Sequence, residues 1–170
     1  MADSSPLLIF GGTFNPIHLG HLSMARQTLD FFGASRMLLV PSAEPPHRAT
    51  PSVTVDDRLA MARLAAKEDP RLQVDDREVR RGGRSYTVDT LADIRSEYGL
   101  DRPLIFCLGS DAFNGITTWH EWNRLFDLAH ICVISRPDQV VELNKCAREV
   151  FDARVATSAS ELLKQPVGGI

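Results

Sequence analysis

The hydrophobic residues of this chain form short continuous runs separated by stretches with a helical period. Apolar runs bounded by turn residues predict buried strands at residues 7–10, 37–40, 72–74, 104–108 and 131–134. After the first run, apolar residues recur three or four positions apart until a glycine stop, as in Leu22, Ala25, Leu29 and Phe32 before Gly33. Further helices are predicted at about 54–67, where a capping-box pattern opens the segment, and at about 87–98 and 140–150.

Strands that alternate with helices and are apolar on both faces indicate a parallel sheet covered by helices. The sequence therefore predicts an α/β fold, a Rossmann-like doubly wound parallel sheet with helices on both faces, as a single domain over residues 1–170. Ligands of such sheets bind beyond the carboxyl ends of the strands. Functional residues are expected to follow Phe10, Val40, Leu108 and Ile134.

Composition and charge exclude some classes of binding partner. The 170 residues are 44% hydrophobic and 24% charged, and 19 Lys and Arg against 22 Asp and Glu give a net charge of −3. Nucleic-acid-binding domains usually carry a basic excess, so no nucleic acid is expected as partner. No long apolar stretch or basic leader is visible, and we expect no membrane partner and a cytoplasmic location. Cys107, Cys132 and Cys146 lack metal-ligand spacing and are interpreted as buried or inert thiols.

The segment after the first predicted strand, GGTFNPIHLGH at residues 11–21, concentrates groups that suit a polyphosphate. Two glycines at a strand end allow backbone N–H groups to approach an anion closely. The helix that begins near Leu19 directs its positive end at the same place. His18 and His21 are three residues apart and share a face, and Gly20 leaves space between them. Two histidines with no carboxylate nearby do not make a metal site, so none is predicted.

Two other segments carry groups that could bind anions. Two prolines stiffen the loop before His47 and Arg48, which would hold these cations out over the strand ends. The alternative for Arg48 is a solvated surface arginine. Tyr86 and Thr87 stand at a helix start, where N–H groups and a hydroxyl can bind a carboxylate, although an ordinary helix cap explains them as well.

Further candidates follow the last two predicted strands. Trp119 lies in a polar context, where an indole can stack on a pyridinium ring for about 1–2 kcal/mol when desolvated, whereas Trp122 is expected in the core. Asp111 is placed to accept from a ribose hydroxyl or an adenine edge, or to cap a helix. Arg136 follows the strand at 131–134 and could reach a phosphate. A solvated turn explains the basic cluster at residues 80–84.

Residues 11–22, GGTFNPIHLGHL, resemble the signature of the nucleotidylyltransferase superfamily, whose HxGH motif binds ATP phosphates during adenylyl or cytidylyl transfer. Further motifs resemble one family within it, the bacterial nicotinate-nucleotide adenylyltransferases. They are PPHR at 45–48, SYTVDTL at 85–91, and GSD at 109–111 followed by TW at 118–119. The resemblance runs in order from about residue 7 to residue 137. The first motif is shared across the superfamily, and the set together is specific.

The resemblance implies a nucleotidyltransferase of NAD biosynthesis. Its reaction would be adenylyl transfer from ATP to nicotinate mononucleotide, giving nicotinate adenine dinucleotide and pyrophosphate, with Mg²⁺ bound through the ATP phosphates. The resemblance assigns His18 and His21 as catalytic. The ATP-binding residues would be Gly11, Gly12, Thr13, Phe14, His18, Gly20, His21, Asp111 and Arg136. The mononucleotide-binding residues would be His47 and Arg48 on its phosphate, Tyr86 and Thr87 on the nicotinate carboxylate, and Trp119 on the ring.

The chain departs from the family pattern after residue 150. The family carries a Ser-Ser-Thr-x-Ile-Arg segment that completes the ATP phosphate site, whereas TSAS at 157–160 lacks the following arginine and the sequence given ends with PVGGI at 166–170. Either the protein continues beyond residue 170, or this copy lacks part of its phosphate clamp. Two other functions stay open: a pantetheine-phosphate adenylyltransferase, which normally carries Thr where His18 stands, and a nucleotide-binding module without turnover. A homo-oligomer is also left open.

Overall fold

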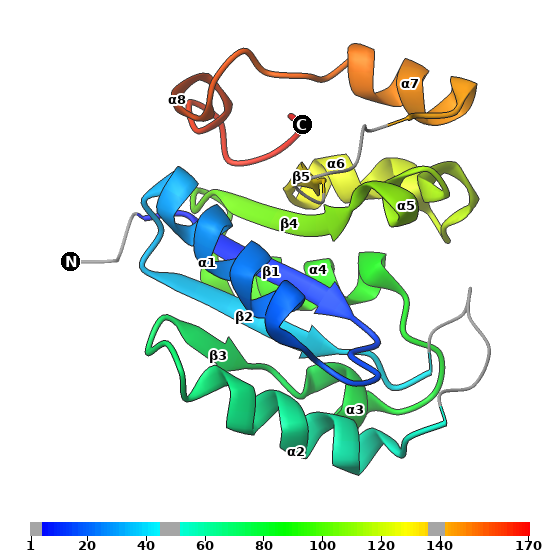
Figure 1. The fold of residues 1–170 in the computed structure, drawn as a ribbon. Helices are drawn as coiled ribbons and strands as arrows, with labels where there is room; N and C mark the ends of the chain where they lie inside the picture. The colour runs from blue at the N-terminus through cyan, green and yellow to red at the C-terminus, as the bar shows by residue number, and fades with distance from the viewer. Residues whose placement is uncertain (1–4, 45–51, 136–141) are drawn as a thin grey trace.

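The computed structural model describes residues 5–44, 52–135 and 142–170. Its centre is one parallel sheet of order β3-β2-β1-β4-β5 (Figure 1). The strands are β1 (Leu7–Gly12), β2 (Arg36–Pro41), β3 (Leu72–Val74), β4 (Leu104–Gly109) and β5 (His130–Ile134). The order confirms the predicted doubly wound α/β fold, because the chain moves outward on one side of β1 and then crosses to the other side at β4.

Helices cover both faces of the sheet, and α1 and α4 lie on opposite sides of it (Figure 1). The longer helices are α1 (Leu19–Phe32), α2 (Val55–Ala66), α4 (Thr87–Tyr98) and α7 (Lys145–Asp152). The short ones are α3 (Arg77–Arg81), α5 (Ser110–Phe113), α6 (Leu125–Leu128) and α8 (Ala159–Leu162), with 3₁₀ turns η1 (Ile116–Thr118) and η2 (Trp122–Arg124). Within the described ranges, no helix is both long and apolar enough to cross a bilayer.

Two hydrophobic cores form because side chains of β1 alternate between the faces. Leu7 and Ile9 are buried in one cluster with Leu91 of α4, and Leu8 and Phe10 are buried in the other with residues of α1. Strands that are apolar on both faces were the signal for a parallel sheet, and this packing is the physical reason for the pattern.

The predicted boundaries hold best where a local stop or cap is present. Gly33 ends α1 in a left-handed conformation, and the Thr54 side chain caps α2 by accepting from the N–H of Asp57, as the capping box predicts. The last predicted helix, 140–150, is wrong at its start: α7 begins at Lys145, because the Asn144 side chain accepts from the N–H of Ala147 and caps the helix there.

Arg58 of α2 connects the two loops that leave β1 and β2. Its side chain is 1% exposed, and its guanidinium donates to the carbonyl of Thr13 at 2.6 Å and to that of Ala43 at 3.1 Å. Burial lowers the pKa of Arg58, since the charged form loses its hydration. The cation therefore fixes the spacing of the two loops at the carboxyl edge of the sheet.

Two buried side chains hold residues 165–170 against the outer edge of β5. His130 accepts from the N–H of Gly169 at Nδ1, so its Nε2 carries the proton and donates to the carbonyl of Gln165. Arg95 of α4 donates to the carbonyls of Leu128 and Pro166. Burial lowers the pKa of His130, and the nearby guanidinium of Arg95 acts in the same direction.

The cysteines are only in part as expected. Cys107 is buried, and Cys132, its register partner on the neighbouring strand, is partly buried. The hydrogen bond with Cys132 and burial raise the pKa of Cys107, which fits an inert thiol. Cys146 is exposed on α7.

Replacing Arg58 by Met should lower the free energy of unfolding by about 1–3 kcal/mol, because two buried carbonyls lose their donor. Urea unfolding would measure the loss. The matched control is Arg63→Met on the same helix, where a half-exposed side chain pairs with Asp76 and the cost should stay below about 1 kcal/mol. Equal losses for the two variants would contradict the bridging role of Arg58.

Stability should fall as the pH drops below about 6.5, the ordinary pKa of histidine. The pKa of folded His130 is lowered, so the unfolded chain binds a proton first. The contribution of neutral His130 is thus complete above about pH 6.5 and is lost as the pH falls through the folded pKa. Urea unfolding at pH about 7.5 and about 5.5 tests this. His130→Gln should show a smaller difference between the two pH values, and an unchanged difference would refute the assignment.

Candidate active site

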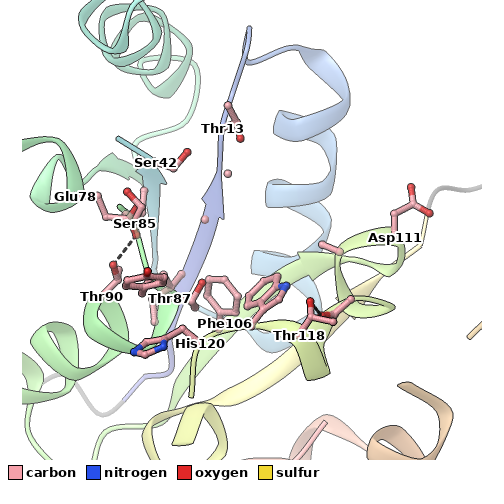
Figure 2. A pocket seen from close by; sticks show the side chains of 18 residues that line it. Thr13, Ser42, Glu78, Ser85, Thr87, Thr90, Phe106, Asp111, Thr118 and His120 are labelled. Atoms are coloured by element: carbon pink, nitrogen blue, oxygen red, sulfur yellow. Dashed lines mark hydrogen bonds between the residues drawn. The ribbon is translucent and has the colours of Figure 1, made fainter. Parts of the chain in front are cut away.

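A pocket of about 340 Å³ opens beyond the carboxyl ends of the central strands, where the fold predicts a ligand. Its wall is built by residues from β1, β2, α3, the start of α4, and the segment from α5 to η1 (Figure 2). The lining residues are Ile9, Gly11, Gly12, Thr13, Val40, Ser42, Glu78, Ser85, Tyr86, Thr87, Thr90, Phe106, Asp111, Ala112, Gly115, Thr118, Trp119 and His120.

The strands supply an apolar part of the pocket wall. Ile9, Val40 and Phe106 come from the three central strands and are buried. A Cβ on Gly11 would lie 3.0 Å from the ring of Phe106, so a side chain here would require this ring to shift by a few tenths of an ångström. Backbone N–H groups of β1 are therefore kept close to whatever occupies the pocket.

The amino-terminal end of α4 faces the same pocket. Tyr86 is its cap residue, and no side chain caps the helix there. The side chains of Thr54, Asn144 and Ser158 cap α2, α7 and α8, whereas α3, α5 and α6 share the lack of a side-chain cap with α4. The first N–H groups of α4 and the hydroxyl of Thr87 thus offer donors, and the helix dipole favours a negative group at this place.

Aromatic rings also line the pocket near this helix end. Trp119 follows η1, is partly buried, and meets Phe106 edge to face at 6.3 Å. The ring of His120 lies 4.5 Å from that of Tyr86. A flat ring with an anionic substituent would fit between the indole and the start of α4, since the indole face attracts a cationic ring and the helix end attracts the anion.

Two histidines form a separate cluster at the start of α1. The backbone N–H of His18 donates to Nδ1 of His21 at 3.2 Å, and the two rings are 3.8 Å apart. Because Nδ1 accepts, Nε2 of a neutral His21 carries the proton and can donate. The ring of His21 is supported edge-on by buried Phe14 at 5.2 Å.

Gly20 lies close beside the ring of His18. A Cβ at position 20 would lie 3.0 Å from two atoms of the His18 imidazole. That is tighter than ordinary packing allows, so a side chain here would displace the ring. The spacing of the HxGH motif therefore has a steric reason in this chain.

The predicted site residues fall into three sets. Seven line the pocket together: Gly11, Gly12, Thr13, Tyr86, Thr87, Asp111 and Trp119. Four make up the cluster at the start of α1 and lie outside the pocket wall: Phe14, His18, Gly20 and His21. The remaining three, His47, Arg48 and Arg136, lie outside the described residues. Trp122 packs on the core as expected, 6.5 Å from Phe126.

Sequence reasoning missed several lining residues, above all Glu78. Its side chain is buried on α3, where no sequence pattern indicated a function. The basic turn beside it is also more than a solvated hairpin, because Arg81 donates to the hydroxyl of Thr90. Ser85 and Thr90 lie inside the motif SYTVDTL, so that motif was the signal that could have found them.

The part of the chain that the structure describes holds no group of three His, Cys, Asp or Glu side chains that could bind a metal ion. The donors in the site are backbone N–H groups, hydroxyls and imidazoles. This donor set suits phosphate and carboxylate groups rather than a metal ion held by protein ligands alone.

Comparisons with known proteins agree with this geometry. Residues 9–162 match the model of the cytidylyltransferase-like family. A protein of Hahella chejuensis, named "Probable nicotinate-nucleotide adenylyltransferase", is 43% identical over 100% of this chain and 78% of its own length. One of the same name from Pseudomonas putida is 45% identical over 95% of this chain and 74% of its own.

Solved structures show the same fold. Nicotinic acid mononucleotide adenylyltransferase of Plasmodium falciparum, complexed with NaAD, superposes with a TM-score of 0.70 at 17% identity over 85% of this chain and 70% of that one. The same enzyme complexed with APC gives a TM-score of 0.67 at 16% identity over the same shares. From the family match and the whole-chain identity of these relatives, the chain belongs to the cytidylyltransferase-like family and, within it, to the nicotinate-nucleotide adenylyltransferases.

Proposed function

We propose that this chain transfers the adenylyl group of ATP to nicotinate mononucleotide and releases pyrophosphate. One observation carries the choice of substrate: the uncapped start of α4 and the indole of Trp119 line the same pocket. The first binds a carboxylate and the second a cationic ring, and nicotinate mononucleotide carries both. The names of the relatives point to the same substrate.

The reaction needs no nucleophile from the protein. A phosphate oxygen of the mononucleotide attacks the α-phosphorus of ATP, and the bond from that phosphorus to the bridging oxygen of the β-phosphate breaks. The electron pair of this bond leaves with pyrophosphate, and the product is nicotinate adenine dinucleotide. Catalysis then consists of holding two anionic reactants in line and stabilising the charge that develops.

The two histidines are proposed to stabilise this charge. Nε2 of His21 donates to a phosphate oxygen, while its Nδ1 is held by the N–H of His18. The positive end of α1 and the N–H groups near Gly11 and Gly12 contribute positive electrostatic potential at the same phosphate groups. Phe14 packs edge to face against the ring of His21 and restricts its orientation, so the ring needs little reorganisation when the transition state forms.

The remaining contacts complete the proposed substrate complex. His47 and Arg48 would bind the mononucleotide phosphate, and the chain enters their segment from Glu44, whose carbonyl accepts from the N–H of Ser85 beside the pocket. Asp111 would accept from a ribose hydroxyl or adenine, and Arg136 would meet an ATP phosphate. Mg²⁺ would arrive on the phosphates of ATP as part of that substrate.

Replacing His21 by Ala should lower kcat by about 10²–10³, the cost of losing one donor to a transition-state oxyanion. Pyrophosphate release with ATP, Mg²⁺ and nicotinate mononucleotide measures it. His21→Asn is the second variant, because its side-chain oxygen can still accept from the N–H of His18 while the imidazole is gone. Both variants should keep the unfolding midpoint near wild type, and activity within about tenfold of wild type would exclude the proposed role.

The chain should prefer the acid over the amide form of the mononucleotide by about 10–100-fold in kcat/KM. An amide places N–H groups against the donors at the start of α4 and leaves them mispaired, at a cost of about 1–3 kcal/mol. Thr87→Val should reduce the preference, whereas Thr87→Ser, which keeps the hydroxyl, should retain most of it. Equal efficiency with both forms would count against the carboxylate site.

A further inference from the structure

The mechanism proposed above leaves one buried acidic group in the pocket wall without a role. Glu78 is 8% exposed and comes from α3, a helix that supplies no other lining residue. Its carboxyl accepts from the hydroxyl of Thr90 at 2.5 Å, and the nearby hydroxyl of Ser85 also interacts with it. Figure 2 shows the three side chains gathered at one side of the pocket.

The direction of the hydrogen bonds makes the carboxyl the common acceptor. The oxygen of Ser85 accepts from the backbone N–H of Ala43 at 2.9 Å, and the interaction of its hydroxyl with Glu78 lowers the pKa of that carboxyl. The oxygen of Thr90 accepts from Arg81 at 2.9 Å, and its proton also goes to Glu78. A carboxylate accepts such protons in charge-assisted bonds, whereas the amide of a glutamine is a neutral, weaker acceptor and replaces one oxygen by an NH₂ donor.

These bonds connect two segments that are far apart in the sequence. Ser85 directly precedes Tyr86 and Thr87, and its own N–H donates to the carbonyl of Glu44. On the other side, the carbonyl of Ala43 accepts from buried Arg58. The carbonyl of Ala43 is thus held by a cation, and its N–H by Ser85, whose hydroxyl interacts with the carboxyl of Glu78.

Direct contact with the substrate does not account for Glu78. The proposed substrate is anionic at its carboxylate and at its phosphate, and its cationic ring is proposed to lie on Trp119, so Glu78 has no assigned partner on the substrate. Burial raises the pKa of Glu78, while the hydroxyls of Thr90 and Ser85 lower it less. A carboxyl kept there at a desolvation cost must act through the groups that it holds.

We infer that Glu78 is a positioning residue for the mononucleotide: its carboxyl fixes Ser85 and Thr90 and so sets the start of α4 relative to the segment after β2. This inference rests on the proposed function, because those two segments are the ones proposed to bind the nicotinate carboxylate and to lead to the phosphate-binding residues. The cluster of His18 and His21 at the start of α1 is not part of this network.

The kinetic test compares Glu→Gln changes at two glutamates, each of which links α3 to α4. Glu78→Gln should raise KM for nicotinate mononucleotide about tenfold, with kcat and KM for ATP within about threefold of wild type. Glu97→Gln is the control, since Glu97 of α4 pairs with Arg77 of α3 at 2.9 Å on the surface and does not line the pocket. The control should leave all three constants near wild type. Similar constants for Glu78→Gln and wild type would overturn the inference.

A second pair of variants covers the case in which Glu78→Gln does not fold. Thr90→Val removes the hydroxyl at nearly constant shape, and Thr90→Ser keeps it. Thr90→Val should raise KM for the mononucleotide by about the same factor as Glu78→Gln, and Thr90→Ser should recover most of the loss. Equal constants for Val and Ser would show that the hydroxyl network does not position the substrate.

Amide hydrogen exchange separates this inference from the proposed function, because it needs no substrate. The N–H groups of Ala43 and Ser85 should exchange about tenfold faster in Glu78→Gln and Thr90→Val than in wild type or Glu97→Gln. Unchanged exchange at these two positions would refute the coupling, whatever substrate the enzyme uses. If exchange is faster in these variants but the wild-type chain does not turn over nicotinate mononucleotide, the proposed function is refuted. The coupling would still stand.

Discussion

The central position of β1 is the constraint on which the rest of the site depends. Its residues hydrogen bond to β2 on one side and to β4 on the other, so the chain that leaves Gly12 can turn only above the carboxyl edge of the sheet. That path brings the start of α1 beside the loops that follow β2 and β4. The groups proposed to bind phosphate and the groups proposed to bind the pyridine ring are neighbours because of this topology.

Two buried charges of opposite sign stabilise that edge without forming an ion pair with each other. Arg58 binds main-chain carbonyls, and Glu78 binds hydroxyls. Each charge is solvated by neutral dipoles of the loops, which orients those loops in a region of low dielectric constant. Arg58 binds the carbonyl of Ala43, and Ser85, which lies beside Glu78, accepts from its N–H, so the loop after β2 is fixed from two directions.

The sequence was most informative where a feature is local or repeated. Apolar runs located all five strands, and stops such as Gly33 located helix ends, because each depends on a few adjacent residues. The motifs also indicated which loops meet at the pocket. The role of Arg58 and the burial of Glu78 could not be predicted, since both depend on partners brought together by the tertiary fold: Thr13 lies 45 positions from Arg58, and Thr90 lies 12 positions from Glu78. Short helices such as α3 and α5 carry too few residues to show a period.

The two tryptophans of this chain differ in what surrounds them, and this gives the protein an optical probe of its own. Trp119 lines the pocket, while Trp122, three residues later, packs edge-on against Phe126 away from it. Emission from the first indole depends on the occupant of the pocket, and emission from the second supplies a constant background. A pyridinium ring stacked on an indole quenches its fluorescence. Occupancy of the pocket can therefore be followed by the tryptophan fluorescence of the unlabelled chain.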